Sequence, residues 1–260
     1  MTTARRAELA DNLAATRARI AAACAAAGRD VSEITLIAVT KTRPATDVAA
    51  LADLGLADFG ENKDQEAAPK AAAVAEATSL PVRWHFIGQL QTNKAHSVVR
   101  YASVVHSVDR LRLVRALGAA SRAAATAATA ATAAAETSTG PSAAPTAAGA
   151  PVSCLVQVSL DGDPSRGGAL ISQLPEIAAA IEAEEGLTLG GVMAVAPLGV
   201  PPETAFAELG PISNTVREIN PAATVISAGM TGDLEAAVRH GATHLRIGTA
   251  LLGNRSLPLL

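Results

Sequence analysis

The chain opens with one long amphipathic pattern, and shorter segments of two kinds then alternate. Over residues 3–27 apolar side chains recur at near-helical spacing, at Leu9, Leu13, Ile20 and Cys24. Gly28 follows this pattern and is a common helix stop. The pattern predicts an amphipathic helix that precedes the first strand.

Eight short apolar runs come after this helix. The candidate strands cover residues 34–39, 57–60, 84–87, 104–108, 154–159, 191–195, 224–227 and 244–247. The candidate helices between them cover residues 46–54, 62–77, 92–101, 109–135, 169–185, 202–219 and 232–240. Repeated strand-helix order predicts a parallel sheet covered by helices, and eight repeats predict a single (β/α)8 barrel of the TIM type.

A doubly wound open sheet is the rival architecture. It would place a glycine-rich fingerprint in the first strand-helix turn, because the backbone there approaches a pyrophosphate closely. That turn reads TKTRP at residues 40–44, so the open sheet is disfavoured.

One segment interrupts the alternation. Residues 119–151 consist almost entirely of Ala, Thr, Ser, Gly and Pro. Alanine has the highest helix propensity, so residues 123–135 are predicted to extend the preceding helix, and residues 137–151 to form a mobile surface loop. We interpret residues 1–260 as one domain with an inert insertion at about 119–151, and a partner-binding role for the insertion is the alternative.

Composition narrows the function classes. The sequence is 49% hydrophobic with a net charge of -3 and 2% aromatic residues, so it can bury a core and offers no case for nucleic-acid binding. Cys24 and Cys154 lie far apart without CxxC spacing, which indicates no disulfide framework and a reducing cytoplasm. No export signal or membrane span is expected.

The carboxyl ends of the predicted strands carry the candidate chemistry, because barrel active sites lie there. The loops after strands seven and eight read SAGMTG and GT, and the hydroxyls of Ser227, Thr231 and Thr249 could donate to phosphate oxygens. Small residues also form ordinary tight turns, so these loops alone leave both interpretations open.

Lys41 ends an otherwise apolar strand. Its stem is predicted to point into the barrel mouth, where desolvation lowers the pKa of an ammonium group. A neutral amine can attack an aldehyde, and pyridoxal 5'-phosphate (PLP) carries both an aldehyde and a phosphate. A solvated surface ammonium is the alternative for an isolated lysine.

Three other polar residues are candidates within the mouth. Arg246 is predicted to share the barrel interior with the cofactor ring, unless it forms a structural ion pair with Glu61. Asn62 and His85 could bind ring substituents or could simply tie strand ends together. His240 and His244 flank a helix end and a strand start, so no metal site is predicted.

Five motifs in the same order resemble the YggS/PROSC family of PLP homeostasis proteins. They are LIAVTK at 36–41, FGEN at 59–62, WHFIG at 84–88, SAGMT at 227–231 and RIGTALLG at 246–253. The resemblance implies a fold-type III barrel like the N-terminal domain of alanine racemase, with PLP held as a Schiff base on Lys41 and Arg246 near the pyridine nitrogen. The implied cofactor-binding set also includes Asn62, His85, Ser227, Gly229, Met230, Thr231, Gly248 and Thr249.

The resemblance implies a carrier more than an enzyme. Racemases of this fold need a second domain that supplies a tyrosine base, and this chain ends at Leu260, shortly after the eighth strand. We therefore expect a cytoplasmic, monomeric PLP carrier or buffer that affects amino-acid and keto-acid balance and serves PLP-dependent apoenzymes. A weak PLP-dependent racemase or decarboxylase and a Schiff-base sugar-phosphate aldolase are the alternatives.

Overall fold

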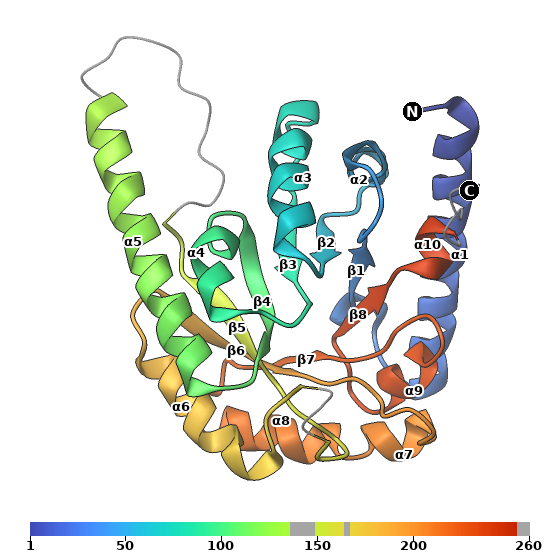
Figure 1. Cartoon of the computed structure of the whole chain (residues 1–260). Helices are drawn as coiled ribbons and strands as arrows, with labels where there is room; N and C mark the ends of the chain where they lie inside the picture. The colour runs from blue at the N-terminus through green and yellow to red at the C-terminus, as the bar shows by residue number, and fades with distance from the viewer. Residues whose placement is uncertain (136–148, 164–166, 254–260) are drawn as a thin grey trace, which may run out of the picture.

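Eight parallel strands close into one barrel in the order of the sequence (Figure 1). The structure is a computed structural model and describes residues 1–135, 149–163 and 167–253. The strands are β1 Thr35–Val39, β2 Asp58–Glu61, β3 Arg83–Phe86, β4 Ala102–Val108, β5 Val152–Gln157, β6 Leu187–Met193, β7 Val225–Ser227 and β8 His244–Ile247. Closure is direct, since Ile37 of β1 is in register with Asp58 of β2 on one side and with Arg246 of β8 on the other. The predicted barrel is confirmed.

Helices cover the outside of the barrel (Figure 1). They are α1 Thr3–Ala27, α2 Ala45–Asp53, α3 Asp64–Ala77, α4 Ala95–Val98, α5 Leu111–Ala135, α6 Leu174–Ala183, α7 Pro202–Phe206, α8 Leu209–Arg217, α9 Leu234–Arg239 and α10 Thr249–Leu252. The prediction of one helix at 202–219 is wrong in one respect, because the segment is divided into two helices, α7 and α8. The physical reason is Pro211, which cannot donate to the carbonyl of Ala207 and whose ring clashes with that carbonyl.

Helix α1 completes the ring of helices. It packs against α9 and α10 on one side and α2 on the other, and its buried stripe includes the predicted Leu9, Leu13, Ile20 and Cys24. Arg19 pairs with Glu235 of α9 at 2.5 Å. The first helix of the chain therefore occupies the place that a long helix after β8 would otherwise fill.

Two cores follow from strand alternation. Side chains pointing outward pack against the helices, and Phe59, Trp84, Phe86 and Phe206 are all buried. The inward side chains include the apolar Ile37, Leu155 and Met193 beside a group of buried polar residues. A polar group inside a barrel needs internal partners, and these are described with the site.

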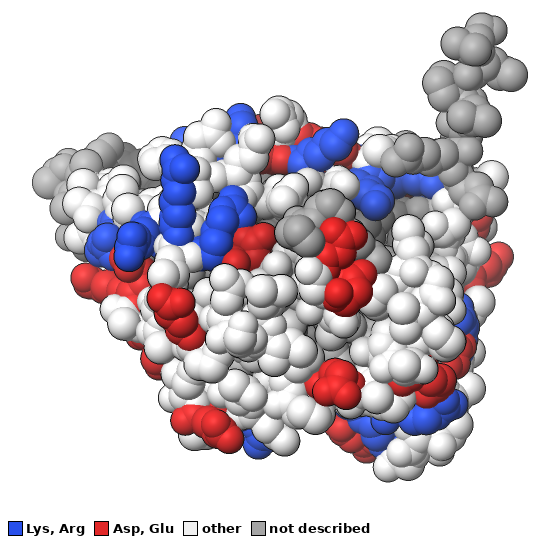
Figure 2. Space-filling view, turned by 60° about the horizontal axis from the view of Figure 1, so that its bottom comes forward, with Lys and Arg blue, Asp and Glu red and all other residues white. Residues whose placement is uncertain are grey.

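The alanine-rich segment behaves in part as predicted. Residues 123–135 continue α5, whose side chains between 122 and 131 are mostly exposed, and the helix extends away from the barrel in Figure 1. Most of the loop predicted at 137–151 lies outside the described residues. None of the helices within the described ranges is both long and apolar enough to span a membrane. On the face in Figure 2, acidic and basic side chains are interspersed.

Candidate functional site

Lys41 lies in a tight turn directly after β1. The N–H of Arg43 donates to the carbonyl of Thr40 at 3.0 Å, which closes a four-residue turn with Lys41 and Thr42 as its central residues. Thr42 has a φ of 64° and is the one non-glycine residue of the described chain in the left-handed region. Lys41 itself is exposed. The predicted desolvation of the Lys41 stem is therefore wrong, because the residue lies in an exposed turn after β1 and not within the buried strand.

A cleft of about 340 Å³ brings Lys41 together with the loop after β8. Its lining includes Lys41, Gly248 and Thr249, three of the residues predicted to bind the cofactor, with Val39 and Leu252 as apolar wall. Strands β1 and β8 are neighbours in the sheet, so their carboxyl ends meet at this cleft. Sequence positions more than 200 residues apart thus contribute to one site.

The loops after β7 and β8 offer backbone donors. The main-chain amides of Gly229, Thr231, Gly232 and Thr249 make no hydrogen bond within the described residues. Unpaired amides in a glycine-rich loop are suited to an anion such as phosphate. Met230 is 40% exposed in the same loop, and its amide is already bonded to Asp233.

Gly229 is required by the close packing of its loop. Its φ is 93°, and a Cβ at this position would lie 2.6 Å from the Cβ of Ala237 and 2.8 Å from a methyl of Leu245. A side chain would therefore push β7 away from α9. The small residue allows the loop amides to reach the barrel mouth.

Arg246 is buried inside the barrel, as predicted. Its guanidinium donates to Ser227 Oγ at 2.6 Å and to the carbonyl oxygen of Ala194 at 2.9 Å. Burial lowers the pKa of Arg246 to about 10. Within the described residues no carboxylate forms a salt bridge with it, and Glu61, the proposed alternative partner, instead pairs with Lys70 at 2.6 Å. A buried cation with only neutral partners favours binding of an electron-rich ligand atom.

Ser227 continues from Arg246 into a chain of buried hydrogen bonds. Ser227 Oγ lies 2.9 Å from His106 Nδ1, and His106 Nε2 lies 2.9 Å from His85 Nδ1. His85 Nε2 then lies 2.8 Å from Asp58 Oδ1. Because a guanidinium only donates, Ser227 accepts from Arg246 and its hydrogen is left for His106. The Asp58 carboxylate only accepts, so His85 Nε2 donates to it, and with neutral rings every bond of the series then runs toward Asp58.

The pKa directions agree with this assignment. Burial lowers the pKa of His85 and, still further, that of His106, so both rings are neutral and each has one donor and one acceptor nitrogen. Burial alone would raise the pKa of Asp58, but the hydrogen bond from His85 and nearby charges lower it overall. The chain ends on a carboxylate that also pairs with Arg83 at 2.8 Å.

This series of buried hydrogen bonds changes the interpretation of two candidate cofactor-binding residues. His85 and Ser227 lie in the barrel interior, where both ring nitrogens of His85 and the hydroxyl of Ser227 are engaged in hydrogen bonds within the protein. Direct contacts from them to a cofactor stay predictions. Asn62 is half-buried, and its side-chain amide makes no hydrogen bond among the described residues.

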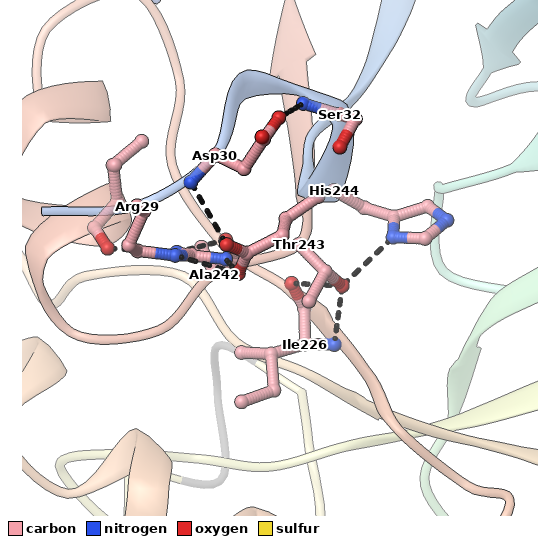
Figure 3. Close-up of polar contacts among 9 residues, drawn as sticks. Arg29, Asp30, Ser32, Ile226, Ala242, Thr243 and His244 are labelled. Carbon is pink, nitrogen blue, oxygen red and sulfur yellow. Dashed lines mark hydrogen bonds and ion pairs between the residues drawn. The ribbon is translucent and has the colours of Figure 1, made fainter. Parts of the chain in front are cut away.

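Sequence reasoning missed His106 and Asp58. His106 lies within a predicted strand, on the same face of that strand as the inward positions, and a histidine in an apolar run was the available signal. Asp58 occupies the first position of β2, where its carboxylate reads as a strand-end polar group. His240 and His244 make separate bonds, to Glu203 and Thr243, as Figure 3 shows for the latter.

Known proteins have a similar sequence and a similar barrel. The family model described as "Alanine racemase, N-terminal domain" matches residues 12–256. A protein named "Pyridoxal phosphate homeostasis protein" from Mycobacterium tuberculosis is 45% identical, over 97% of this chain and 95% of its own length.

Two solved structures extend the comparison. PipY of Synechococcus elongatus with PLP bound matches with a TM-score of 0.73 at 27% identity, covering 94% of this chain and all of that one. Alanine racemase from Corynebacterium glutamicum matches with a TM-score of 0.62 at 13% identity, which supports the fold alone, and the match covers 97% of this chain and 62% of the racemase. The identity and coverage of the homeostasis proteins place this chain in their family: it belongs to the pyridoxal phosphate homeostasis proteins, which share the alanine racemase N-terminal barrel.

Proposed function

We propose that this protein binds PLP and acts in its homeostasis as a carrier or buffer, which affects amino-acid and keto-acid balance. In this proposal the Nζ of Lys41 forms a Schiff base with the cofactor aldehyde. The observation that carries the proposal is the cleft in which Lys41 faces Gly248 and Thr249. An amine and a group of phosphate-binding amides in one cleft match the two ends of PLP.

The residues present fit this cofactor. Unpaired amides of the loops after β7 and β8 suit the phosphate, with Gly229, Thr231 and Thr249 among them. The Arg246 guanidinium forms no salt bridge with a carboxylate of the described residues, and it can donate to the pyridine nitrogen. When bound, PLP supplies a reactive aldehyde and an aromatic ring able to accept electrons. Asn62, His85, Ser227, Met230 and Gly248 complete the proposed set.

A carrier is favoured over an amino-acid racemase by the position of the single tyrosine. Tyr101 lies in the turn before β4, and its hydroxyl donates to Asp64 Oδ1 of α3 at 3.4 Å. Burial and the Asp64 carboxylate raise the pKa of Tyr101. This position is on the outside of the barrel, so Tyr101 is poorly placed to be a second acid or base opposite the lysine.

Several further properties belong to the same proposal. We propose PLP-dependent apoenzymes as recipients of the cofactor, a cytoplasmic location, a monomer, and one domain that spans residues 1–260. They rest on the role in PLP homeostasis, which the names of the relatives and the barrel fold support.

The test is the visible spectrum of the purified protein after incubation with PLP and removal of the free cofactor. Wild type should be yellow, and borohydride followed by peptide mass mapping should find the pyridoxyl group on Lys41. Lys41→Ala should lose the colour, whereas Lys63→Ala, which changes an exposed lysine at the start of α3, should keep it. A colourless wild type, or label on Lys63 in place of Lys41, would refute the proposal.

A further inference from the structure

The turn that carries Lys41 is held from outside the barrel by a second lysine. Lys70 of α3 is buried, and its ammonium group donates to the carbonyl of Thr40 at 2.8 Å. The same group donates to Glu61 Oε1 at 2.6 Å and to Glu66 Oε1 at 2.7 Å. All three hydrogens of Lys70 are thus used, and one of them fixes the residue before Lys41.

The residue after Lys41 is held by the same network. Glu66 Oε1, which accepts from Lys70, also accepts the main-chain N–H of Thr42. The Thr40 hydroxyl donates to Glu61 Oε1 at 2.7 Å, which adds a second contact on the first side of the turn. The chain is therefore fixed immediately before and immediately after Lys41 through one ammonium group.

The turn needs this support because Thr42 adopts an unfavourable backbone conformation. A β-branched residue at a φ of 64° is disfavoured by contact of its Cβ with the backbone, and glycine usually occupies such a turn position. Without the bond from Thr42 to Glu66, the backbone would relax toward negative φ. Lys41 would then leave the direction that places it in the cleft with Gly248 and Thr249.

The buried carboxyl group of Glu61 depends on Lys70 within this network. Glu61 is fully buried, and burial raises the pKa of its carboxyl group while the hydrogen bonds from Lys70 and Thr40 lower it. Its Oε2 atom has no partner among the described residues. Removal of the Lys70 ammonium would leave this carboxyl group with the Thr40 hydroxyl as its remaining donor.

We propose that Lys70, acting through Glu66, is a positioning residue for Lys41: it holds the turn at residues 40–43 in the conformation that directs the Lys41 amine into the cleft. The inference rests on the proposed function in one respect, that Lys41 is the lysine that binds PLP. Lys70 itself does not touch the cofactor in this scheme.

Hydrogen exchange of the cofactor-free protein tests the turn without any PLP. In wild type, the amides of Thr42 and Arg43 should be protected, because both donate hydrogen bonds. In Lys70→Met their protection should fall about tenfold or more, as expected when hydrogen bonds to a charged group are lost. The matched control is Lys63→Met, the same chemical change at the exposed residue that precedes α3. It should leave the protection of both amides unchanged.

Uptake of PLP gives the second readout. Lys70→Met should bind PLP on Lys41 more slowly and hold it about tenfold more weakly, while Lys63→Met should match wild type. Because removal of Lys70 leaves Glu61 buried, Glu66→Ala provides a milder variant that removes the acceptor of the Thr42 amide and one acceptor of Lys70, and keeps the Lys70–Glu61 pair. Glu66→Gln keeps an acceptor oxygen and should retain most of the protection.

A compensating substitution separates positioning from general stability. Thr42→Gly removes the cost of positive φ, so adding it to Lys70→Met should restore PLP uptake toward wild type without restoring the melting temperature fully. Unchanged amide protection in both Lys70→Met and Glu66→Ala would overturn the proposal, as would failure of Thr42→Gly to restore any uptake. If wild type takes up no PLP but the amides respond as stated, the proposed function fails and the turn assignment stands.

Discussion

At the scale of single residues, the barrel interior is notable for histidines that are kept neutral. Burial lowers the pKa of His85 and of His106, and it lowers the pKa of His244 to about 4. The rings of His85 and His244 lie 6.3 Å apart, so a charge on one disfavours a charge on the other. Neutral rings are what the chain of hydrogen bonds toward Asp58 requires.

These histidines predict a loss of stability in mild acid. A histidine whose pKa is lower in the folded state is protonated first in the unfolded state, so stability falls as pH decreases from about 6.5 to 4. For His244 the loss at pH 5 is about 2 kcal/mol. Urea unfolding of His244→Gln should therefore show a change between pH 7.5 and 5 that is smaller by that amount. His96→Gln, an exposed histidine of α4, should behave like wild type, and an equal pH dependence in all three proteins would contradict the assignment.

The sequence predicts which residues form the site better than it predicts the environment of each residue. Lys41, Gly248 and Thr249 are brought into one cleft because each follows a strand that ends at the barrel mouth. The exposure of Lys41 and the role of Lys70 could not be predicted, since both depend on the left-handed φ of Thr42. A threonine gives no signal for that conformation, in contrast to a glycine.

At the scale of elements, α1 is fastened to the last βα unit by arginines. Arg29 follows α1 and donates to the carbonyl of Ala242 at 2.7 Å (Figure 3). It also donates at 2.8 Å to the carbonyl of Val238, which accepts the N–H of Gly241 as well at the end of α9. It also pairs with Glu33, a residue whose side chain is half exposed. The two carbonyl contacts carry more of the stabilisation than the exposed ion pair.

Substitution of Arg29 should separate these contributions. Arg29→Met keeps much of the stem but removes a hydrogen bond to each of the two carbonyls and leaves that of Ala242 without its side-chain donor, so it should lower the free energy of unfolding by about 1–3 kcal/mol. Glu33→Gln keeps the oxygen that accepts the Asp30 amide and removes only an exposed ion pair, so it should cost less than Arg29→Met. Guanidinium unfolding curves measure both. A larger loss for Glu33→Gln than for Arg29→Met would show that the ion pair dominates.

Element positions followed from the sequence because strand and helix periodicities differ clearly. All eight strands overlap their predicted runs, and α1 has the predicted bounds. Two of the differences lie at prolines: Pro211 divides the predicted helix at 202–219, and α6 begins at Leu174 with Pro175 in its first turn, later than predicted. A third lies in the helix predicted at 92–101, of which only Ala95–Val98 is α-helical, after a 3-10 turn at Thr92–Lys94. Hydrophobic periodicity gives no signal for the missing main-chain N–H of a proline.

At the scale of the whole molecule, the alanine-rich insertion is peripheral to the barrel. The residues that flank it converge, because Ser121 Oγ and the amide of Val152 both donate to the carbonyl of Gly186, at 2.8 Å and 3.0 Å. Most side chains of α5 beyond Arg122 are exposed and bury little apolar surface. The barrel therefore closes independently of the segment between these two points.

Replacement of residues 124–149 by a linker of about four residues should leave the fold intact. The melting temperature should change by about 3 °C or less, and PLP uptake should equal that of wild type. A scrambled insertion of the same composition is the control for length. A large loss of stability on deletion, but not on scrambling, would show that the segment itself contributes to the barrel.

The position of α1 has a consequence for how the chain reaches its folded state. Arg19 meets Glu235 across 216 residues, and Arg5 donates to the carbonyl of Leu252 across 247. During synthesis, the first helix emerges long before α9 and α10 exist, so its apolar stripe has to wait for the end of the chain. Such distant contacts slow folding, since the entropy of loop closure is lost before the packing energy is gained. The helix that is made first is thus among the last to be buried, and a nascent chain that stalls before β8 would expose it to chaperones and proteases.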